Sequence, residues 1–311
     1  MNPLEPILEQ QGFVMLDGGL ATEMERRGAD LDRFVWSARM LAESPELIRD
    51  VHFDYLAAGA DVIATATYQA SFAGFERAGY SQAEGDALMR LAVELAIEAR
   101  DAFWADPANR GGRQRPLVAA SIGPYGACLH DGSEYHGDYG VGPEEVREFH
   151  RPRMDVLSDT GADLFAFETI PSRAEAEVLL HLIQDYPGCS AWLSFSCRNE
   201  AEVSHGEPFA ECAALADEAD QILAVGLNCT APEHVSALLE SAREIAKPLA
   251  VYPNSGEQWE AEGNRWTGQG VQALTAAEWF RRGARLIGGC CRTTAGDIRR
   301  MRAELDAEVA R

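Results

Sequence analysis

The sequence has no long apolar run and no recognisable export signal. No segment approaches the roughly 20 consecutive apolar residues that a membrane-spanning helix needs, so no transmembrane helix is predicted. The first residues, MNPLEPILEQQG, lack a basic region followed by an apolar run, and this beginning is not typical of a secretory signal. We therefore expect a cytoplasmic protein with no membrane partner.

Basic residues and disulfide spacings are also scarce. The chain of 311 residues has 27 lysines and arginines against 50 aspartates and glutamates, a formal net charge of -23. This charge argues against nucleic acid as a partner and would attract a cationic small molecule. The seven cysteines do not follow a disulfide framework, so we expect thiols that are free or bound to metal.

Signs of a dinucleotide-binding fold or of several domains are missing too. No G-x-G-x-x-G follows an apolar run, which argues against a doubly wound sheet, and no linker or low-complexity segment divides the chain. What the sequence does contain is eight short apolar runs separated by segments of helical periodicity, the pattern of buried parallel strands. They span 13–17, 61–67, 116–123, 163–169, 191–196, 223–229, 248–254 and 285–291.

The segments between these runs predict the architecture. Tight joints precede several runs, whereas long polar loops follow others, notably 124–143, 197–208 and 255–270. Eight strands with short turns at one end and elaborate loops at the other indicate an α/β protein with a (β/α)8 TIM barrel, which we expect to occupy residues 1–311 as a single domain. His52 lies on the apolar stripe of one predicted helix, so we interpret it as a packed core histidine.

In such a barrel the chemistry belongs at the C-terminal ends of the strands. Polar and thiol side chains stand at these ends: Asp17, Thr67, Glu168, Ser196, Cys229, Asn254, Cys290 and Cys291. Adjacent residues of a regular strand point to opposite faces, so Cys290 and Cys291 can share a site only if the chain bends there. We expect Gly288 and Gly289 to allow that bend.

Three thiols at one end of the barrel have two interpretations. Cys229, Cys290 and Cys291 can be buried small hydrophobes, as free cysteine often is. They can also be three ligands of a catalytic zinc ion that keeps its fourth position open. Because two of them are adjacent on a glycine bend just before a predicted helix, where thiolate is favoured, we predict the metal site.

Other cysteines and histidines give no comparable pattern. Cys128, His130 and His136 lie in the third loop, where they are either a second metal site or, in our interpretation, solvated loop residues. Cys197 follows the fifth predicted strand without a partner, and Cys189 and Cys212 are interpreted as structural.

Five motifs together point to a known family. The segments MLDGGLATEME, ETIPS, GLNCTAP, YPNSGE and GGCCRTT, in this order over nearly the whole chain, resemble the zinc- and homocysteine-dependent S-methyltransferases. The resemblance implies that Cys229, Cys290 and Cys291 bind Zn2+ and that Asp17 and Glu168 bind the homocysteine amino group. It implies, less directly, that the strand end with Thr67 and Tyr68 lines the substrate site.

The resemblance also suggests a reaction. GPYGACLHDGSEYHGDYG and YPNSGEQW are similar to the branch that takes the methyl group from S-methylmethionine or S-adenosylmethionine. The expected reaction passes this methyl to homocysteine and gives methionine, with the metal-activated substrate thiolate as nucleophile and no catalytic side chain required. Betaine as donor is the nearest alternative. A thiol-based zinc-binding or redox-sensing barrel and an aldolase or phosphate-binding barrel are more remote, and the oligomeric state stays open.

Overall fold

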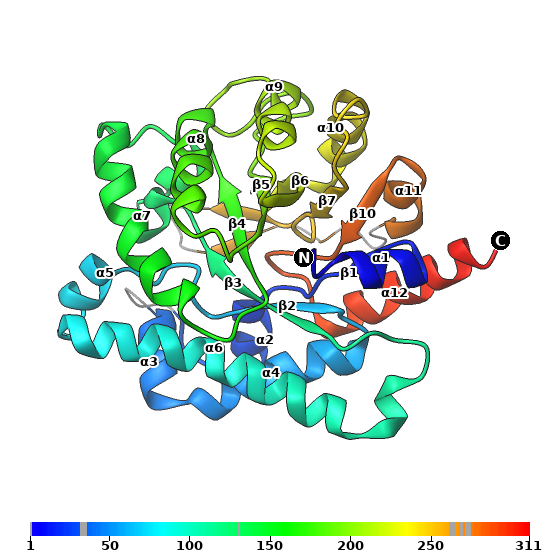
Figure 1. Cartoon of the computed structure of the whole chain (residues 1–311), viewed down its shortest axis with the longest axis horizontal. Coiled ribbons are helices and arrows are strands. Elements are labelled where there is room, and N and C mark those ends of the chain that lie inside the picture. The colour runs from blue at the N-terminus through cyan, green and yellow to red at the C-terminus, as the bar shows by residue number, and fades with distance from the viewer. Residues whose placement is uncertain (1, 32–35, 130, 261–264, 268–269, 271–274) are drawn as a thin grey trace.

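Eight parallel strands form the centre of the molecule in this computed structural model (Figure 1). The structure describes residues 2–31, 36–129, 131–260, 265–267, 270 and 275–311. The strands are β1 (Val14–Met15), β2 (Val62–Ala64), β3 (Leu117–Ile122), β4 (Leu164–Ile170), β5 (Ala191–Phe195), β6 (Ile222–Asn228), β7 (Leu249–Tyr252) and β10 (Ala284–Ile287). Each falls in one of the eight predicted runs, apart from one residue at an end of β4, β6 and β10 (Ile170, Ile222 and Ala284), so the strand predictions are confirmed.

The hydrogen-bonding order closes the sheet. Neighbouring strands pair in the order β1-β10-β7-β6-β5-β4-β3-β2, and a parallel bridge between Leu16 and Val62 joins the two ends of that order. The predicted (β/α)8 barrel is therefore confirmed. A short antiparallel hairpin of β8 (Gln258–Glu260) and β9 (Arg265–Thr267) lies outside it, within a segment that the sequence predicted only as a loop.

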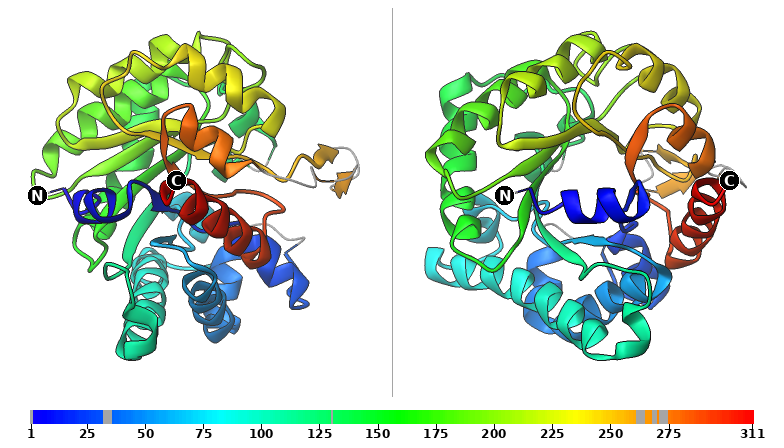
Figure 2. Two further views of the ribbon diagram at one scale, coloured as in Figure 1. Left: turned by 90° about the vertical axis from the view of Figure 1, so that its right-hand side faces the viewer. Right: turned by 45° about the vertical axis from the view of Figure 1, so that its right-hand side comes forward.

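Helices form the outer layer around these strands (Figure 2). They are α1 (Glu5–Gln11), α2 (Leu20–Arg26), α3 (Trp36–Glu43), α4 (Pro45–Ala58), α5 (Phe72–Arg77), α6 (Gln82–Ala105), α7 (Pro143–Ser158), α8 (Arg173–Leu182), α9 (Phe209–Ala214), α10 (Val235–Ser241), α11 (Ala276–Arg281) and α12 (Ala295–Val309). Among the described residues, no helix combines the length and the apolar character needed to cross a bilayer.

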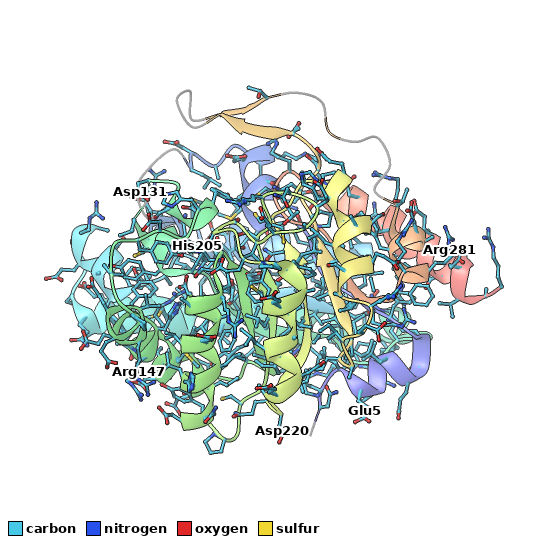
Figure 3. All side chains as sticks on the ribbon, turned by 90° about the horizontal axis from the view of Figure 1, so that it is seen from above. Glu5, Asp131, Arg147, His205, Asp220 and Arg281 are labelled. Carbon is cyan, nitrogen blue, oxygen red and sulfur yellow. The ribbon has the colours of Figure 1, made fainter. Side chains whose placement is uncertain are left out.

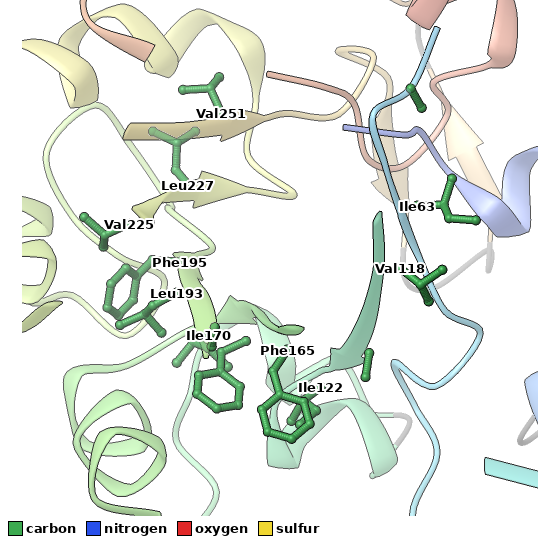
Figure 4. Close-up of a cluster of buried hydrophobic side chains, with 14 of the residues drawn as sticks. Ile63, Val118, Ile122, Phe165, Ile170, Leu193, Phe195, Val225, Leu227 and Val251 are labelled. Carbon is green, nitrogen blue, oxygen red and sulfur yellow. The ribbon is translucent and has the colours of Figure 1, made fainter. Parts of the chain in front are cut away.

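Side chains on each strand alternate between two apolar cores, as the pleat of a strand requires. The outer core lies between strands and helices, and Figure 4 shows part of it, including Ile63, Val118 and Phe165. The inner core fills the barrel and combines small residues such as Ala119 and Ala166 with larger ones such as Leu286. His52 is fully buried in the helical layer, so its interpretation as a core histidine is confirmed.

The two ends of the barrel differ in what covers them. Ile7 of α1 and Leu4 just before it belong to the inner core, so α1 closes the N-terminal end, and Figure 2 shows it lying across the ring of helices. Figure 3 shows Glu5 and Asp220 at this end and the β8–β9 hairpin at the opposite one. The C-terminal ends of the strands are therefore left for a site.

Polar contacts fix the closed end. Asp61, 2% exposed, accepts hydrogen bonds from Arg302 Nη1 at 3.0 Å, Arg113 Nη2 at 3.3 Å and the Met15 amide at 2.9 Å. Lys247, which stands just before β7, donates to the carbonyls of Ala219 and Ile222. These bonds tie helices and turns to the strand beginnings at the end of the barrel away from the site.

Candidate active site

A cavity opens at the C-terminal ends of the strands, and its wall combines thiols, carboxylates and aromatic rings. All eight barrel strands contribute to it, most of them through their last residues or the loop that follows, whereas β5 contributes Trp192 from within the strand. Within the described residues, no lysine, arginine or histidine lines this cavity. The groups used below are Asp17, Glu168, Cys229, Cys290, Cys291, Tyr68, Tyr135, Trp192, Asn228 and Tyr252.

The structure brings the three predicted cysteines together. The Sγ atom of Cys229 lies 3.1 Å from that of Cys290 and 3.5 Å from that of Cys291. Within the described part of the chain, no other group of three histidine, cysteine or acidic side chains is close enough to hold a metal ion. Four sulfurs at about 2.3 Å from a tetrahedral zinc ion are about 3.8 Å apart, so the triad needs only slight expansion to fit one.

Two glycines allow the adjacent cysteines to share the site, but through close packing rather than an unusual backbone conformation. A Cβ on Gly288 would lie 2.6 Å from Cβ of Leu16, and one on Gly289 would lie 2.3 Å from Oγ1 of Thr293. The left-handed residues are instead Cys229, with φ 49°, and Arg292, with φ 63°. The expectation that the glycines supply the bend is thus refined: they let the loop lie against β1.

Main-chain bonds hold the cysteine loop in place. The amide of Cys290 donates to the Pro253 carbonyl at 2.8 Å, and the amide of Cys291 donates to Oδ1 of Asn254 at 3.2 Å. The N-cap of α12 follows, where Thr294 and Asp297 form a capping box. The loop therefore lies between the end of β7 and the beginning of α12, with both thiols toward Cys229.

Hydrogen bonds among the three thiols shift their pKa values in opposite directions. Hydrogen bonding to Cys290 and burial raise the pKa of Cys229, whereas hydrogen bonds from Cys229 and Cys290 lower the pKa of Cys291. Three ionised sulfurs at these distances repel one another, so holding all three as thiolates requires a cation between them. The donor set therefore fits a soft metal ion such as zinc.

Two carboxylates face the same cavity. Asp17 accepts a hydrogen bond from the Ala64 amide at 2.8 Å, and Glu168 accepts one from the Ser121 hydroxyl. Burial, with a smaller contribution from the neighbouring charge of Glu168, raises the pKa of Asp17, and burial raises the pKa of Glu168 to about 7. A cationic group that enters between them would restore the ionised form of both.

Of the adjacent residues Thr67 and Tyr68, only Tyr68 lines the cavity. Thr67 is fully buried, and its hydroxyl donates to the Ser121 carbonyl at 2.6 Å, so it lies behind the cavity wall. Tyr68 lies on the wall itself, where Gly123 leaves room for its ring: a Cβ there would be 2.6 Å from two ring carbons. The predicted strand end thus supplies only one of its two expected residues to the cavity.

A buried arginine holds this strand end from outside. Arg153 of α7 is 1% exposed, and its guanidinium donates to the carbonyls of Gly123 at 2.9 Å and Tyr68 at 3.0 Å. The Tyr68 carbonyl also accepts a hydrogen bond from the Gly123 amide at 3.2 Å, so the arginine adds to a main-chain bond between the two segments. The position of Tyr68 therefore depends on a side chain that lies outside the cavity.

Several cavity residues were not found from the sequence. Trp192 and Tyr252 are inward-facing residues of β5 and β7, and the Trp192 indole donates to the Tyr252 hydroxyl at 2.8 Å. Their inward orientation follows from strand alternation and was available as a signal. Tyr135 comes from the short 3-10 helix Ser133–Tyr135 in the third loop, for which the sequence offered no local signal.

The remaining cysteines and histidines lie elsewhere. Cys128 is buried, and His136 is exposed with its Nδ1 accepting the Asp138 amide at 3.1 Å. His130 lies outside the described residues. Among the residues that the structure describes, these side chains form no metal-binding group, and Cys212 is buried in α9 as the structural interpretation expected.

Comparison with known proteins agrees with this geometry. The family model for homocysteine S-methyltransferase matches residues 14–305. The homocysteine S-methyltransferase of Bacillus subtilis is 48% identical over 97% of this chain and 98% of its own length, and that of Escherichia coli is 46% identical over the same shares. A selenocysteine Se-methyltransferase of Brassica oleracea is 44% identical over 97% of this chain and 91% of its own.

Solved structures extend the agreement to three dimensions. The metallated form of the Escherichia coli homocysteine methyltransferase MmuM superposes with a TM-score of 0.86 at 45% identity, and its oxidised form with 0.88 at 45% identity. Each covers 97% of this chain and 99% of the MmuM chain. The chain therefore belongs to the homocysteine S-methyltransferase family and is a methyltransferase.

Proposed function

We propose that this enzyme uses zinc to transfer a methyl group from a sulfonium donor, S-methylmethionine or S-adenosylmethionine, to the sulfur of L-homocysteine, giving methionine. The observation that carries the proposal is the convergence of three thiols and two carboxylates on one cavity. This set suits a substrate that has both a thiol and an ammonium group. We further propose that residues 1–311 act as one cytoplasmic homocysteine-binding domain.

Cys229, Cys290 and Cys291 would hold the zinc ion. Bound zinc would make the homocysteine thiol available as a thiolate at neutral pH, so the protein needs no general base for that proton. The left-handed conformation of Cys229 and the bonds to Pro253 and Asn254 hold the three sulfurs on one side of the cavity. The protein thus orients the nucleophile instead of abstracting its proton.

Asp17 and Glu168 would bind the homocysteine ammonium group through charge-assisted hydrogen bonds. Their raised pKa values mean that a cation is needed to keep both ionised in this buried position. A neutral analogue without the amino group would leave two partly protonated carboxyls in the cavity. This pairing therefore selects an amino acid thiol over a simple alkyl thiol.

The cavity wall supports a cationic donor. The rings of Tyr68, Tyr135, Trp192 and Tyr252 line it, and aromatic faces attract cations. In the reaction the homocysteine sulfur attacks the methyl carbon, the carbon–sulfur bond of the donor breaks, and the donor leaves as a neutral thioether. Because the attraction of the wall for the donor disappears with its charge, product release follows from the same electrostatics.

Other donors and functions have weaker support. Betaine is also a cation and would suit the aromatic wall, but the third-loop sequence resembles that of the sulfonium-using branch. A non-catalytic thiol barrel does not explain the carboxylate pair. An aldolase would place a lysine at a strand end, whereas the single lysine of the sequence, Lys247, stands before β7 at the opposite end.

The test measures methionine formation from homocysteine by zinc-loaded protein, with S-methylmethionine, S-adenosylmethionine and betaine supplied separately. We expect turnover with at least one sulfonium donor. Turnover with betaine alone would overturn the donor assignment and leave the thiol acceptor intact. Absence of product with all three donors, in protein that retains zinc, would refute the proposed reaction.

A further inference from the structure

Asn228 occupies a position between the thiol triad and the carboxylate pair. It is the last residue of β6 and precedes Cys229 directly, and it is 1% exposed. Its side chain contacts β4, two strands away in the sheet, through Thr169. Ser194 of the intervening strand β5 donates to the same amide at 2.8 Å. One buried amide thus bonds residues of two neighbouring strands.

The orientation of this amide is fixed by a donor that cannot change its role. The Thr169 main-chain N–H lies 2.7 Å from Oδ1 of Asn228. A main-chain N–H only donates, so the oxygen must face it, which removes the ambiguity that usually attends an asparagine side chain. The nitrogen therefore faces the other way, 2.8 Å from Oγ1 of Thr169 and 3.9 Å from Sγ of Cys290.

Thr169 needs both of these bonds. Its φ of 62° is in the left-handed region, which is costly for a β-branched residue and persists only where the surroundings enforce it. The Asn228 side chain bonds both the main-chain amide and the hydroxyl of Thr169. Thr169 directly follows Glu168, so the conformation that Asn228 enforces also sets the direction of the Glu168 side chain.

We propose that Asn228 is a positioning residue that couples the Cys290 sulfur to the Glu168 carboxylate, so that metal binding and homocysteine binding depend on one side chain. This inference rests on the proposed function, because it assumes that the triad holds a metal and that Glu168 binds the substrate amino group. The amide N–H stabilises charge on the Cys290 sulfur, and outer contacts of this kind tune a metal site. The amide oxygen and nitrogen hold Thr169, and through it Glu168.

The experiment uses cobalt(II) in place of zinc, because sulfur-to-cobalt charge-transfer absorption reports on the ligating sulfurs without turnover. In Asn228→Leu, which keeps the approximate volume and removes both polar atoms, we expect the charge-transfer band to move to longer wavelength. We also expect zinc affinity, measured by chelator competition, to fall by roughly 10- to 100-fold. The dissociation constant of homocysteine should rise by roughly five- to tenfold.

Two further variants separate the halves of the coupling. Asn228→Asp keeps an oxygen for the Thr169 amide and loses the donor to Cys290, so it should shift the cobalt band with a smaller change in homocysteine affinity. It also decides the question if Asn228→Leu does not fold. Ser121→Ala removes the hydroxyl that bonds Glu168 without touching Asn228 or Cys290, so it should weaken homocysteine binding and leave the band unchanged.

The possible results distinguish this inference from the proposed function. If the wild-type protein gives no sulfur-to-cobalt band, the proposed metal site itself is refuted. If the wild-type band is present and both Asn228 variants keep its position and the wild-type zinc affinity, the contact with Cys290 has no role. If the band shifts while homocysteine affinity stays at the wild-type value in Asn228→Leu, the coupling to Glu168 is refuted.

Discussion

Replacing His52 tests whether a buried, unpaired imidazole controls the stability of the barrel in mild acid. His52 lies on α4, fully buried, and neither ring nitrogen has a hydrogen-bond partner among the described residues. Burial lowers its pKa from 6.5 to about 4, because the charged ring would lose its hydration. The folded protein therefore accommodates only the neutral ring.

The sign of the pH dependence follows from where each state takes up a proton. Between pH 6.5 and about pH 4 the unfolded chain protonates this histidine and the folded chain does not, so acid favours unfolding across that window. At about 1.4 kcal/mol for each tenfold difference, the full effect is roughly 3 kcal/mol. Above pH 6.5 both states hold the neutral ring, and this contribution to the pH dependence vanishes.

The assay is urea unfolding, followed by tryptophan fluorescence, of the wild type, His52→Leu and His52→Gln across this pH range. Neither replacement titrates, so relative to the wild type both variants should gain roughly 3 kcal/mol between pH 7 and pH 4. The leucine also removes two buried unpaired nitrogens, worth about 1–3 kcal/mol, so it alone should be more stable at pH 7. A stability difference that stays constant with pH in both variants would refute the reasoning.

Three further predictions concern the site and the closed end of the barrel. Cys290→Ser should weaken zinc binding by more than about 100-fold and abolish methyl transfer, whereas the control Cys212→Ser, which changes a buried thiol of α9, should keep the metal. Dialysis against a chelator followed by metal analysis checks both variants. Full activity of the metal-stripped Cys290→Ser protein would contradict the proposed role. Gly123→Ala should displace the Tyr68 ring, because the new Cβ would be 2.6 Å from it. We expect steady-state kinetics to show kcat/KM lower by about 10- to 100-fold, with the metal content unchanged. Wild-type kinetics would show that Tyr68 is not part of the substrate site. Asp61→Ala should remove the buried carboxylate that pairs with the partly buried Arg113 and Arg302, and we expect thermal unfolding to show a loss of about 3–5 kcal/mol. A loss below about 1 kcal/mol would count against this role.

The barrel could be predicted because its signal is local. Each strand is a short apolar run covered on both faces, and burial on both faces leaves a mark in every run independently. The same holds for Cys229, Cys290 and Cys291, because the C-terminal ends of parallel strands all lie at one end of a barrel. The placement of the three cysteines at that end therefore followed from the order of the runs along the chain.

Residues beyond the regular strands could not be predicted in this way. β2 ends at Ala64, so strand alternation no longer decides which way Thr67 and Tyr68 face. The left-handed conformation of Cys229 likewise breaks alternation, and both Asn228 and Cys229 line the cavity although a continued strand would point them to opposite sides.

Long-range packing places Tyr135. A Cβ on Gly126 would lie 2.5 Å from the Glu134 amide, so this glycine lets the two parts of the third loop touch. The loop is fixed to α8 by a hydrogen bond of 2.7 Å from the Tyr139 hydroxyl to Glu175. Neither contact is marked by sequence spacing, which explains why the loop was predicted and its cavity residue was not.

The position of the single lysine bears on how the enzyme can be attached to a surface. The sequence contains one lysine against 26 arginines, and arginine does not react with amine-directed reagents under mild conditions. Burial lowers the pKa of Lys247, which favours its reactive neutral form. Lys247 stands just before β7, whereas the cavity lies at the C-terminal ends of the strands. Attachment through this side chain therefore places the closed end of the barrel against the support and leaves the cavity facing the solution.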